Sequence, residues 1–332
     1  MRCKFIALVV SGILFAGSAA AQIGAESARC DSTDPQIAIT ACTVVINSPA
    51  SSGVNVSLAL TARALAYEKT GRNDLAMADL DRAIARDAKN PHAWVDRGNL
   101  FLAAGQFERA LADFDHAIGV RSNNPYALGH RGDAWLIHGD PDRAIADYDQ
   151  AIRLDPKNSR LVRNRGEAWR LRGNNEKALA DFERAIALNS SDATAYLDRG
   201  LIYAGAQDET RAMSDFDRAV QLDPGNAAIW MARGNAYARM ADYSHAISDY
   251  RTAVGLGARA AELYADLGLA ELQAGHFQEA ITQFDTALAM GPGDARTIYS
   301  RGMAKLKLGD DRGAREDISA ARLLDPKLPE VN

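Results

Sequence analysis

"AWVDRGNLFLAAGQFERALADFDHAI", residues 93–118, holds two amphipathic stretches on either side of the turn-like sequence AAGQ. In each stretch apolar residues recur at spacings of three and four, which predicts two helices joined by a short turn. The same arrangement returns every 34 residues, eight times, between residues 57 and 328. Such a period is typical of arrays in which every unit buries its apolar face against the next one.

Small residues recur at fixed positions of this repeat, whose positions we number 1 to 34. Alanine occupies positions 20 and 27 in every repeat, and glycine occupies position 8 in seven of the eight. Small side chains let two helices approach closely, while large side chains fill the spaces between them. Four repeats carry proline at position 32, where it ends a helical stretch. Each repeat is therefore predicted to be one closely packed helix pair.

The order of aromatic residues, glycine, alanines and proline in each block resembles the tetratricopeptide repeat. The resemblance implies an all-α fold: a right-handed superhelical solenoid of antiparallel helix pairs, whose inner groove is lined by the first helix of each pair. It also implies that the chain binds a protein or peptide partner. The predicted repeats are residues 57–90, 91–124, 125–158, 159–192, 193–226, 227–260, 261–294 and 295–328, followed by a tail at 329–332.

The first 21 residues have the composition of a secretory signal peptide. Arg2 and Lys4 precede an apolar run at 5–16, and three alanines follow at 19–21. We expect cleavage after this segment, which predicts a periplasmic or secreted protein with no stable membrane span. An uncleaved membrane anchor is the alternative, although the apolar run is short for that role.

Residues 22–56 are predicted to form an N-terminal segment with one capping helix, from the sequence DPQIAITACTVVI at 34–46. Cys30 and Cys42 are the two cysteines that remain after removal of the signal. An even pair in an exported chain predicts a disulfide that staples this cap. A redox-active pair is the alternative, although the spacing is wider than in CxxC motifs.

Composition and motifs favour a noncatalytic protein. Lys and Arg total 38 against 43 Asp and Glu, a net charge of -5, which disfavours nucleic acid as a partner. The sequence has no GxxxxGK[ST], HExxH or GxSxG motif, and its six histidines lack metal-ligand spacing. We therefore predict no enzymatic activity, no cofactor and no bound metal.

Arginine at position 7 and aspartate at position 23 occur together in seven repeats. The pairs are Arg63 and Asp79, Arg97 and Asp113, Arg131 and Asp147, Arg165 and Asp181, Arg199 and Asp215, Arg233 and Asp249, and Arg301 and Asp317. The seventh repeat lacks both and has Leu267 and Gln283 instead. Loss of both partners in one repeat predicts a bidentate bond within each repeat, with a structural role.

One repeat carries an unusual basic cluster. Arg160, Arg163, Glu167 and Arg170 are spaced three, four and three apart, which puts them on one helical face. By the family resemblance this face lines the groove, where Tyr126, His130 and Asp133 of the preceding repeat would approach. The cluster predicts a site for an extended or acidic protein segment. The alternative is a solvated face on which Glu167 neutralises Arg163 and Arg170.

Two further functions remain open at the level of the sequence. The last repeat has Arg322 at position 28, which is aliphatic in the other seven repeats, and Asp311 where Phe107, Tyr243 and Phe277 stand in three others. A partly open face there predicts homo-oligomerisation in a structural or assembly role. An accessory role in the export of envelope polymers rests on the family resemblance alone.

Overall fold

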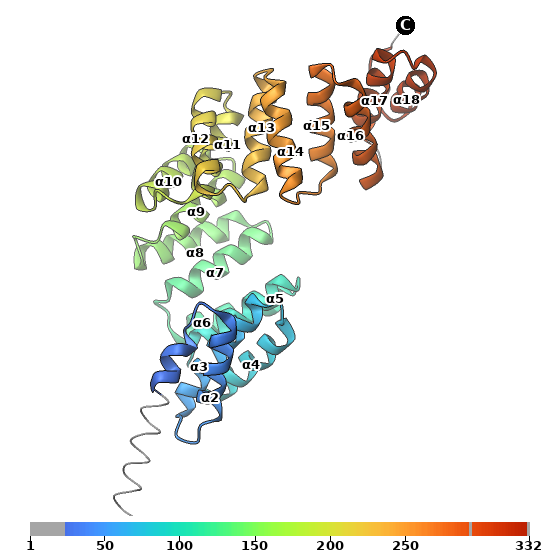
Figure 1. The fold of residues 1–332 in the computed structure, drawn as a ribbon. Helices are drawn as coiled ribbons and strands as arrows, with labels where there is room; N and C mark the ends of the chain where they lie inside the picture. The colour runs from blue at the N-terminus through green and yellow to red at the C-terminus, as the bar shows by residue number, and fades with distance from the viewer. Residues whose placement is uncertain (1–23, 292–293, 331–332) are drawn as a thin grey trace, which may run out of the picture. The chain divides into compact units, whose positions relative to one another are not determined.

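The computed structural model describes residues 24–291 and 294–330, and Figure 1 shows the fold. Within those residues the chain forms helices and turns and no strand, so the predicted all-α class is confirmed. The chain divides into two compact units, Met1–Asn174 and Asn175–Asn332. The predicted repeat at 159–192 supplies its first helix to one unit and its second helix to the other.

The first unit is a stack of helix pairs. Its helices are α2 (Pro35–Asn47), α3 (Gly53–Lys69), α4 (Asn73–Arg86), α5 (Pro91–Ala103), α6 (Phe107–Val120), α7 (Pro125–Ile137), α8 (Pro141–Leu154) and α9 (Ser159–Leu171), and residues 24–30 are also helical. α3 packs on α4, α5 on α6 and α7 on α8, while α2 covers α3. The first helices of successive repeats also touch, α3 against α5, α5 against α7 and α7 against α9, so they share one face of the unit.

The second unit has the same construction. Its helices are α10 (Asn175–Leu188), α11 (Ala193–Gly205), α12 (Glu209–Leu222), α13 (Ala227–Arg239), α14 (Tyr243–Gly255), α15 (Ala261–Ala274), α16 (Phe277–Met290), α17 (Ala295–Lys307) and α18 (Asp311–Leu324). The pairs are α11 with α12, α13 with α14, α15 with α16 and α17 with α18, and α10 packs on α11.

First helices begin at position 1 in seven repeats, and in five of these the side chain at position 34 of the preceding repeat caps the helix by accepting a backbone hydrogen bond. Asn90 and Asn124 accept hydrogen bonds from backbone N–H groups of the following turn, and proline fills the first helical position in both cases. The first repeat differs. Its helix α3 begins at Gly53, four residues before position 1, because Ser52 accepts a hydrogen bond from the N–H of Asn55 and caps the helix there.

The glycine at position 8 allows the two helices of a repeat to approach. A Cβ built at Gly98 would lie 2.7 Å from Cε1 of Phe114, and one at Gly132 would lie 2.8 Å from Cε1 of Tyr148. Both rings are fully buried, and alanines at positions 20 and 27 surround them. In six repeats a buried aromatic or aliphatic side chain therefore packs directly on the glycine of the facing helix.

The turn inside each repeat needs a left-handed residue at position 15. Six repeats place glycine there with positive φ, whereas Gln207 and Ala241 adopt φ values of 60° and 59°.

We expect Ala241→Gly to raise the free energy of unfolding by about 1 kcal/mol. A left-handed alanine costs roughly 1–2 kcal/mol, and the extra freedom of glycine in the unfolded chain offsets part of the gain. Urea unfolding checks this, with Gly139→Ala as the converse control. An unchanged midpoint in both variants would contradict it.

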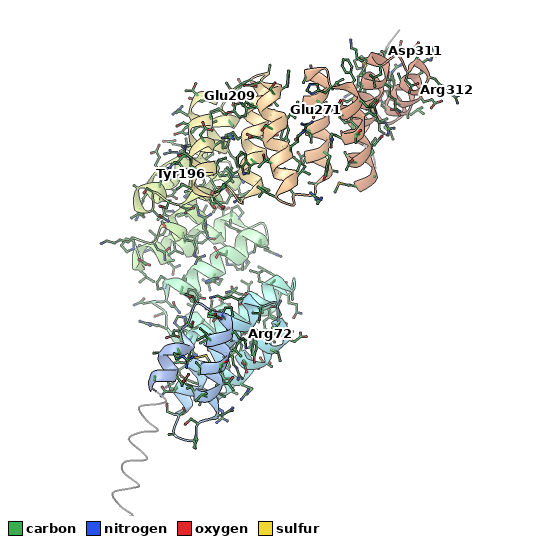
Figure 2. The ribbon with its side chains drawn as sticks, in the orientation of Figure 1. Arg72, Tyr196, Glu209, Glu271, Asp311 and Arg312 are labelled. Atoms are coloured by element: carbon green, nitrogen blue, oxygen red, sulfur yellow. A yellow bond between two sulfur atoms is a disulfide. The ribbon has the colours of Figure 1, made fainter. Side chains whose placement is uncertain are left out.

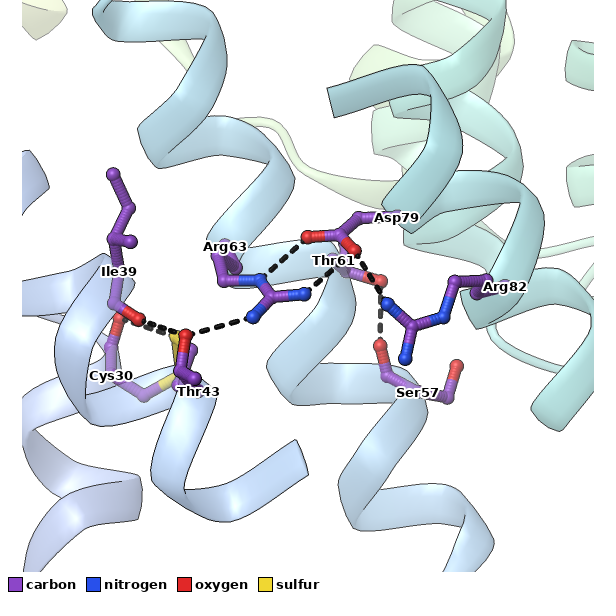
Figure 3. Close-up of polar contacts among 9 residues, drawn as sticks. Cys30, Ile39, Thr43, Ser57, Thr61, Arg63, Asp79 and Arg82 are labelled. Carbon is purple, nitrogen blue, oxygen red and sulfur yellow. Dashed lines mark hydrogen bonds and ion pairs between the residues drawn. A yellow bond between two sulfur atoms is a disulfide. The ribbon is translucent and has the colours of Figure 1, made fainter. Parts of the chain in front are cut away.

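The N-terminal cap is tied down covalently and by hydrogen bonds. Cys30 and Cys42 form the predicted disulfide, and Cys42 is buried against Val45. Thr43 of α2 accepts a hydrogen bond from Nη1 of Arg63 at 2.8 Å, as Figure 3 shows. Arg63 therefore joins the two helices of the first repeat, α3 and α4, and also connects them to α2 of the cap.

The predicted signal peptide at residues 1–21 lies outside the described residues. Across residues 24–291 and 294–330, none of the helices combines the length and the apolar character needed to cross a membrane.

Candidate binding surface

The arginine at position 7 forms a two-pronged bond with the aspartate sixteen residues later. In the repeat 91–124, Nε and Nη2 of Arg97 donate to the two carboxylate oxygens of Asp113, each at 2.8 Å. The same geometry joins Arg63 to Asp79, Arg131 to Asp147, Arg199 to Asp215, Arg233 to Asp249 and Arg301 to Asp317. The aspartates are buried, and hydrogen bonding to the carboxylate raises the pKa of the arginines further above its usual value. The pair of Arg165 and Asp181 stays a prediction.

The same arginines make a second bond that the sequence reasoning missed. Nη1 of Arg97 donates to Asp81 of the preceding repeat at 2.8 Å. Equivalent bonds join Arg131 to Asp115, Arg165 to Asp149, Arg233 to Asp217 and Arg301 to Asp285. An acidic residue recurs at position 25, and that column was the available signal. Each guanidinium has five N–H donors, so it can join two helices of its own repeat and one of the repeat before.

The ion pair that joins the seventh repeat to the sixth has its charges reversed, with the arginine on the sixth repeat. Arg251, at position 25 of the sixth repeat, donates from Nη2 to Oε1 of Glu271 at 2.6 Å. Glu271, which Figure 2 labels on α15, is 0% exposed and takes the place of an aromatic residue. Its other oxygen is 2.6 Å from Nδ1 of His276. Leu267 packs in the apolar cluster with Tyr250, so an apolar residue can occupy the arginine position.

The basic cluster on α9 is largely paired within the chain. Nη1 of Arg160 donates to Oδ2 of Asp133 on α7 at 2.9 Å, and Nδ2 of Asn164 donates to Oδ1 at 2.7 Å. Arg170 donates from Nε and Nη2 to both oxygens of Glu167, at 2.7 and 2.6 Å. Arg163 lies half-buried on the same helix. The predicted α9 residues thus share a helix, and carboxylates balance part of their charge.

His130 is close to this cluster but is not a cation at neutral pH. Its ring lies edge-on to that of Tyr126, with centroids 4.5 Å apart, and Nδ1 is 3.9 Å from Oδ2 of Asp133. Burial lowers the pKa of His130 to about 4, with Arg160 acting in the same direction and Asp133 against it. The imidazole is therefore neutral and contributes packing against Tyr126 to this surface.

Tyr126 also bonds to the preceding repeat, a contact that the sequence did not predict. Its hydroxyl donates to Oδ1 of Asp96 on α5 at 2.9 Å. Burial raises the pKa of Asp96 to about 7; the bond from Tyr126 lowers it and the nearby Glu68 raises it. Between the usual pKa of an aspartate and pH 7 the native state binds more protons than the unfolded chain, so stability falls as pH rises through that range. Ionisation of Asp96 therefore lowers the stability of the folded protein.

Within the described ranges, no group of three or more His, Cys, Asp or Glu side chains is arranged to hold a metal ion.

Comparison with known proteins gives a consistent family. A family profile described as tetratricopeptide repeat matches residues 61–125, 95–159, 131–191, 172–227 and 231–295. A search of curated proteins gives no match.

Several solved structures have a similar fold. A tetratricopeptide repeat protein from Parabacteroides merdae is 18% identical with a TM-score of 0.56, covering 75% of this chain and 98% of its own. PilF of Pseudomonas aeruginosa is 16% identical with a TM-score of 0.57, covering 69% and 100%. A chain of the APC/C hetero-tetramer Cut9–Hcn1 is 18% identical with a TM-score of 0.66, covering 80% and 52%. With repeat profiles matched over most of its length, the chain belongs to the tetratricopeptide repeat family.

Proposed function

We propose that the protein is a noncatalytic scaffold that holds an extended segment of a partner protein across the first helices of its N-terminal unit. The family to which it belongs consists of protein-interaction modules, which supports the general role. In more detail, we propose that an acidic side chain of the partner binds to α9, and the arrangement of Arg160 supports this.

Arg160 is held in place and yet retains donors for a ligand. Its side chain is 39% exposed, and its bond to Asp133 engages Nη1 alone among the described residues. A guanidinium whose position is already fixed loses little freedom when it binds a carboxylate through its remaining N–H groups. This pre-positioned arginine is the observation on which the proposal for an acidic segment rests.

Replacing Arg160 with glutamine should weaken binding of acidic peptides about tenfold, because a charge-assisted hydrogen bond contributes about 1.5–3 kcal/mol. Fluorescence anisotropy with labelled, extended peptides that carry either glutamates or glutamines measures the effect. Arg153→Gln is the matched control, since Arg153 is exposed on α8, away from the first helices. Equal affinity for the glutamate and glutamine peptides in the wild type would refute the acidic preference.

A second function, self-assembly through the last repeat, has an observation in its favour. Leu323 and Leu324 on α18 are 85% and 62% exposed, which is unusual for neighbouring large apolar residues. Light scattering after size-exclusion chromatography should then give an oligomer that Leu323→Glu dissociates, while Leu308→Glu, in the turn before α18, leaves it intact. A wild-type monomer at high concentration would exclude this role.

We also propose export to the periplasm or beyond. The Cys30–Cys42 bond supports it, because structural disulfides persist in oxidising compartments. The intact mass of the protein purified from its native host tests the proposal, which requires loss of residues 1–21.

A further inference from the structure

A cavity in the first unit has features that the proposed acidic-segment site does not use. It has a volume of about 560 Å³ and lies between the N-terminal segment and the first helices of the first three repeats. Leu58 and Leu65 of α3 form an apolar wall, Asp31 lies at the N-terminal side, and Asp96 and Tyr126 come from α5 and α7. Ligand sites in proteins commonly have volumes of about 300–1,000 Å³, so a partner's side chain fits with its neighbours.

Asp96 is the chemically distinctive group of this cavity. It is 3% exposed, and Oδ1 accepts a bond from Tyr126, while Oδ2 accepts none from any residue that the structure describes. Of the described residues that line the cavity, none is lysine or arginine. A buried carboxylate without a cationic partner is costly, and a hydrogen-bonded tyrosine offsets that cost only in part.

Repeat packing does not demand an aspartate at this place. Asp96 occupies position 6, which varies along the chain: Ala62, Asp96, His130, Asn164, Asp198, Ala232, Asp266 and Ser300. The other buried aspartates are at position 23, and arginines hold six of them, whereas Asp96 is held by Tyr126 and borders an open space. Asp96 therefore has the position and surroundings of a ligand-binding group.

We propose that this cavity binds a basic side chain, lysine or arginine, of an extended partner segment. The aliphatic stem would pack on Leu58 and Leu65, and the cationic head would bond to the free oxygen of Asp96, which Tyr126 holds in orientation. Long basic side chains combine an apolar stem with a charged end, and this cavity offers a complementary surface to each part. The proposal stands whether or not α9 binds an acidic residue.

The ionisation of Asp96 supports this assignment and predicts how binding depends on pH. A bound cation stabilises the charged carboxylate, so affinity should fall as Asp96 is protonated between pH 8 and pH 6. The other titratable or charged groups at the site are Glu68 of α3, His92 of α5, Tyr126 of α7 and Asp31. Because several charged or titratable groups surround the cavity, the test compares variants of Asp96 itself.

The test uses blocked, otherwise uncharged octapeptides that differ at one central residue: lysine, norleucine or glutamate. Isothermal titration at pH 8 with the full chain should show the lysine peptide binding at least tenfold tighter than the norleucine peptide. Asp96→Asn, which keeps the shape and the bond from Tyr126, should remove that preference. Ala62→Phe should abolish binding by filling the cavity, whereas Asp74→Asn, exposed on α4 outside the cavity, should change nothing.

Each outcome bears on the proposal. Equal affinities for the lysine and norleucine peptides, or a lysine preference that survives in Asp96→Asn, would overturn it. If Ala62→Phe fails to fold, Asp96→Asn still tests the proposal, because this substitution is nearly isosteric. A melting temperature close to that of the wild type would show that the Asp96→Asn variant is folded. Arg160→Gln separates this site from the α9 site, because it should weaken acidic peptides, whereas removal of a positive charge near Tyr126 should not weaken binding of the lysine peptide.

Discussion

Replacing Asp113 with alanine while Arg97 is retained should lower the free energy of unfolding by about 3–5 kcal/mol, the usual cost of leaving one partner of a buried ion pair alone. Asp113 accepts two hydrogen bonds from the guanidinium of Arg97, and its side chain is buried between α5 and α6. The variant leaves a positive charge in that position with only the exposed Asp81 as partner. Urea unfolding followed by circular dichroism measures the loss.

The seventh repeat supplies the matched control. Its leucine and glutamine at positions 7 and 23 pack without an ion pair, so Arg97→Leu combined with Asp113→Gln copies a natural solution. We expect this double variant to lose clearly less stability than Asp113→Ala alone, because no buried charge is left unpaired. Equal losses in the two variants would mean that packing, rather than charge pairing, accounts for the effect. Hydrogen exchange should place the change in α4 to α6, the helices that Arg97 joins through Asp81 and Asp113.

Removing the disulfide with Cys30→Ala and Cys42→Ala should cost about 3 kcal/mol, because cross-linking a loop of about 13 residues restricts the unfolded chain by that amount. The two cysteines are 12 positions apart in the sequence, and the loop between them contains the first half of α2. In a linear array each element is stabilised by its neighbours, and α2 has a repeat on one side only. We therefore expect the loss to appear first as faster hydrogen exchange in α2 and α3.

Reduction of the wild type with dithiothreitol is the control for the cysteine variant, since it opens the bond without changing the sequence. It should produce the same local loss of protection, while helices α11 to α18 in the second unit keep theirs. Unchanged protection of α2 after reduction would show that Thr43, Arg63 and the apolar contacts of the cap suffice without the covalent bond.

The helices, their pairing and the family were predictable because they depend on local and periodic information. Residues three and four apart form an apolar face, asparagine and proline begin a helix, and glycine at position 8 accommodates a large residue on the facing helix. Each requirement is met again after 34 residues, so eight copies of the same signal support one interpretation. The pairing of Cys30 with Cys42 was equally accessible, because no other cysteine follows the predicted signal.

The candidate site was less predictable, and two side chains show why. Arg160 and Tyr126 were expected on one surface, but Arg160 bonds to Asp133 and Tyr126 to Asp96. The sequence identified the helical faces on which they lie. It placed Asp133 near the α9 cluster without assigning its bond to Arg160, and it did not identify Asp96, 30 residues away, as the partner of Tyr126.

The amino-acid sequence by itself determined which segments become helices, how consecutive helices pair and which family the chain joins, since these follow from short-range spacing repeated along the chain. Only the tertiary structure decided which carboxylate each long polar side chain meets, how deeply Asp96 is buried and that a cavity borders it. Those properties depend on side-chain rotamers and on distances between helices of different repeats, which a 34-residue period leaves free.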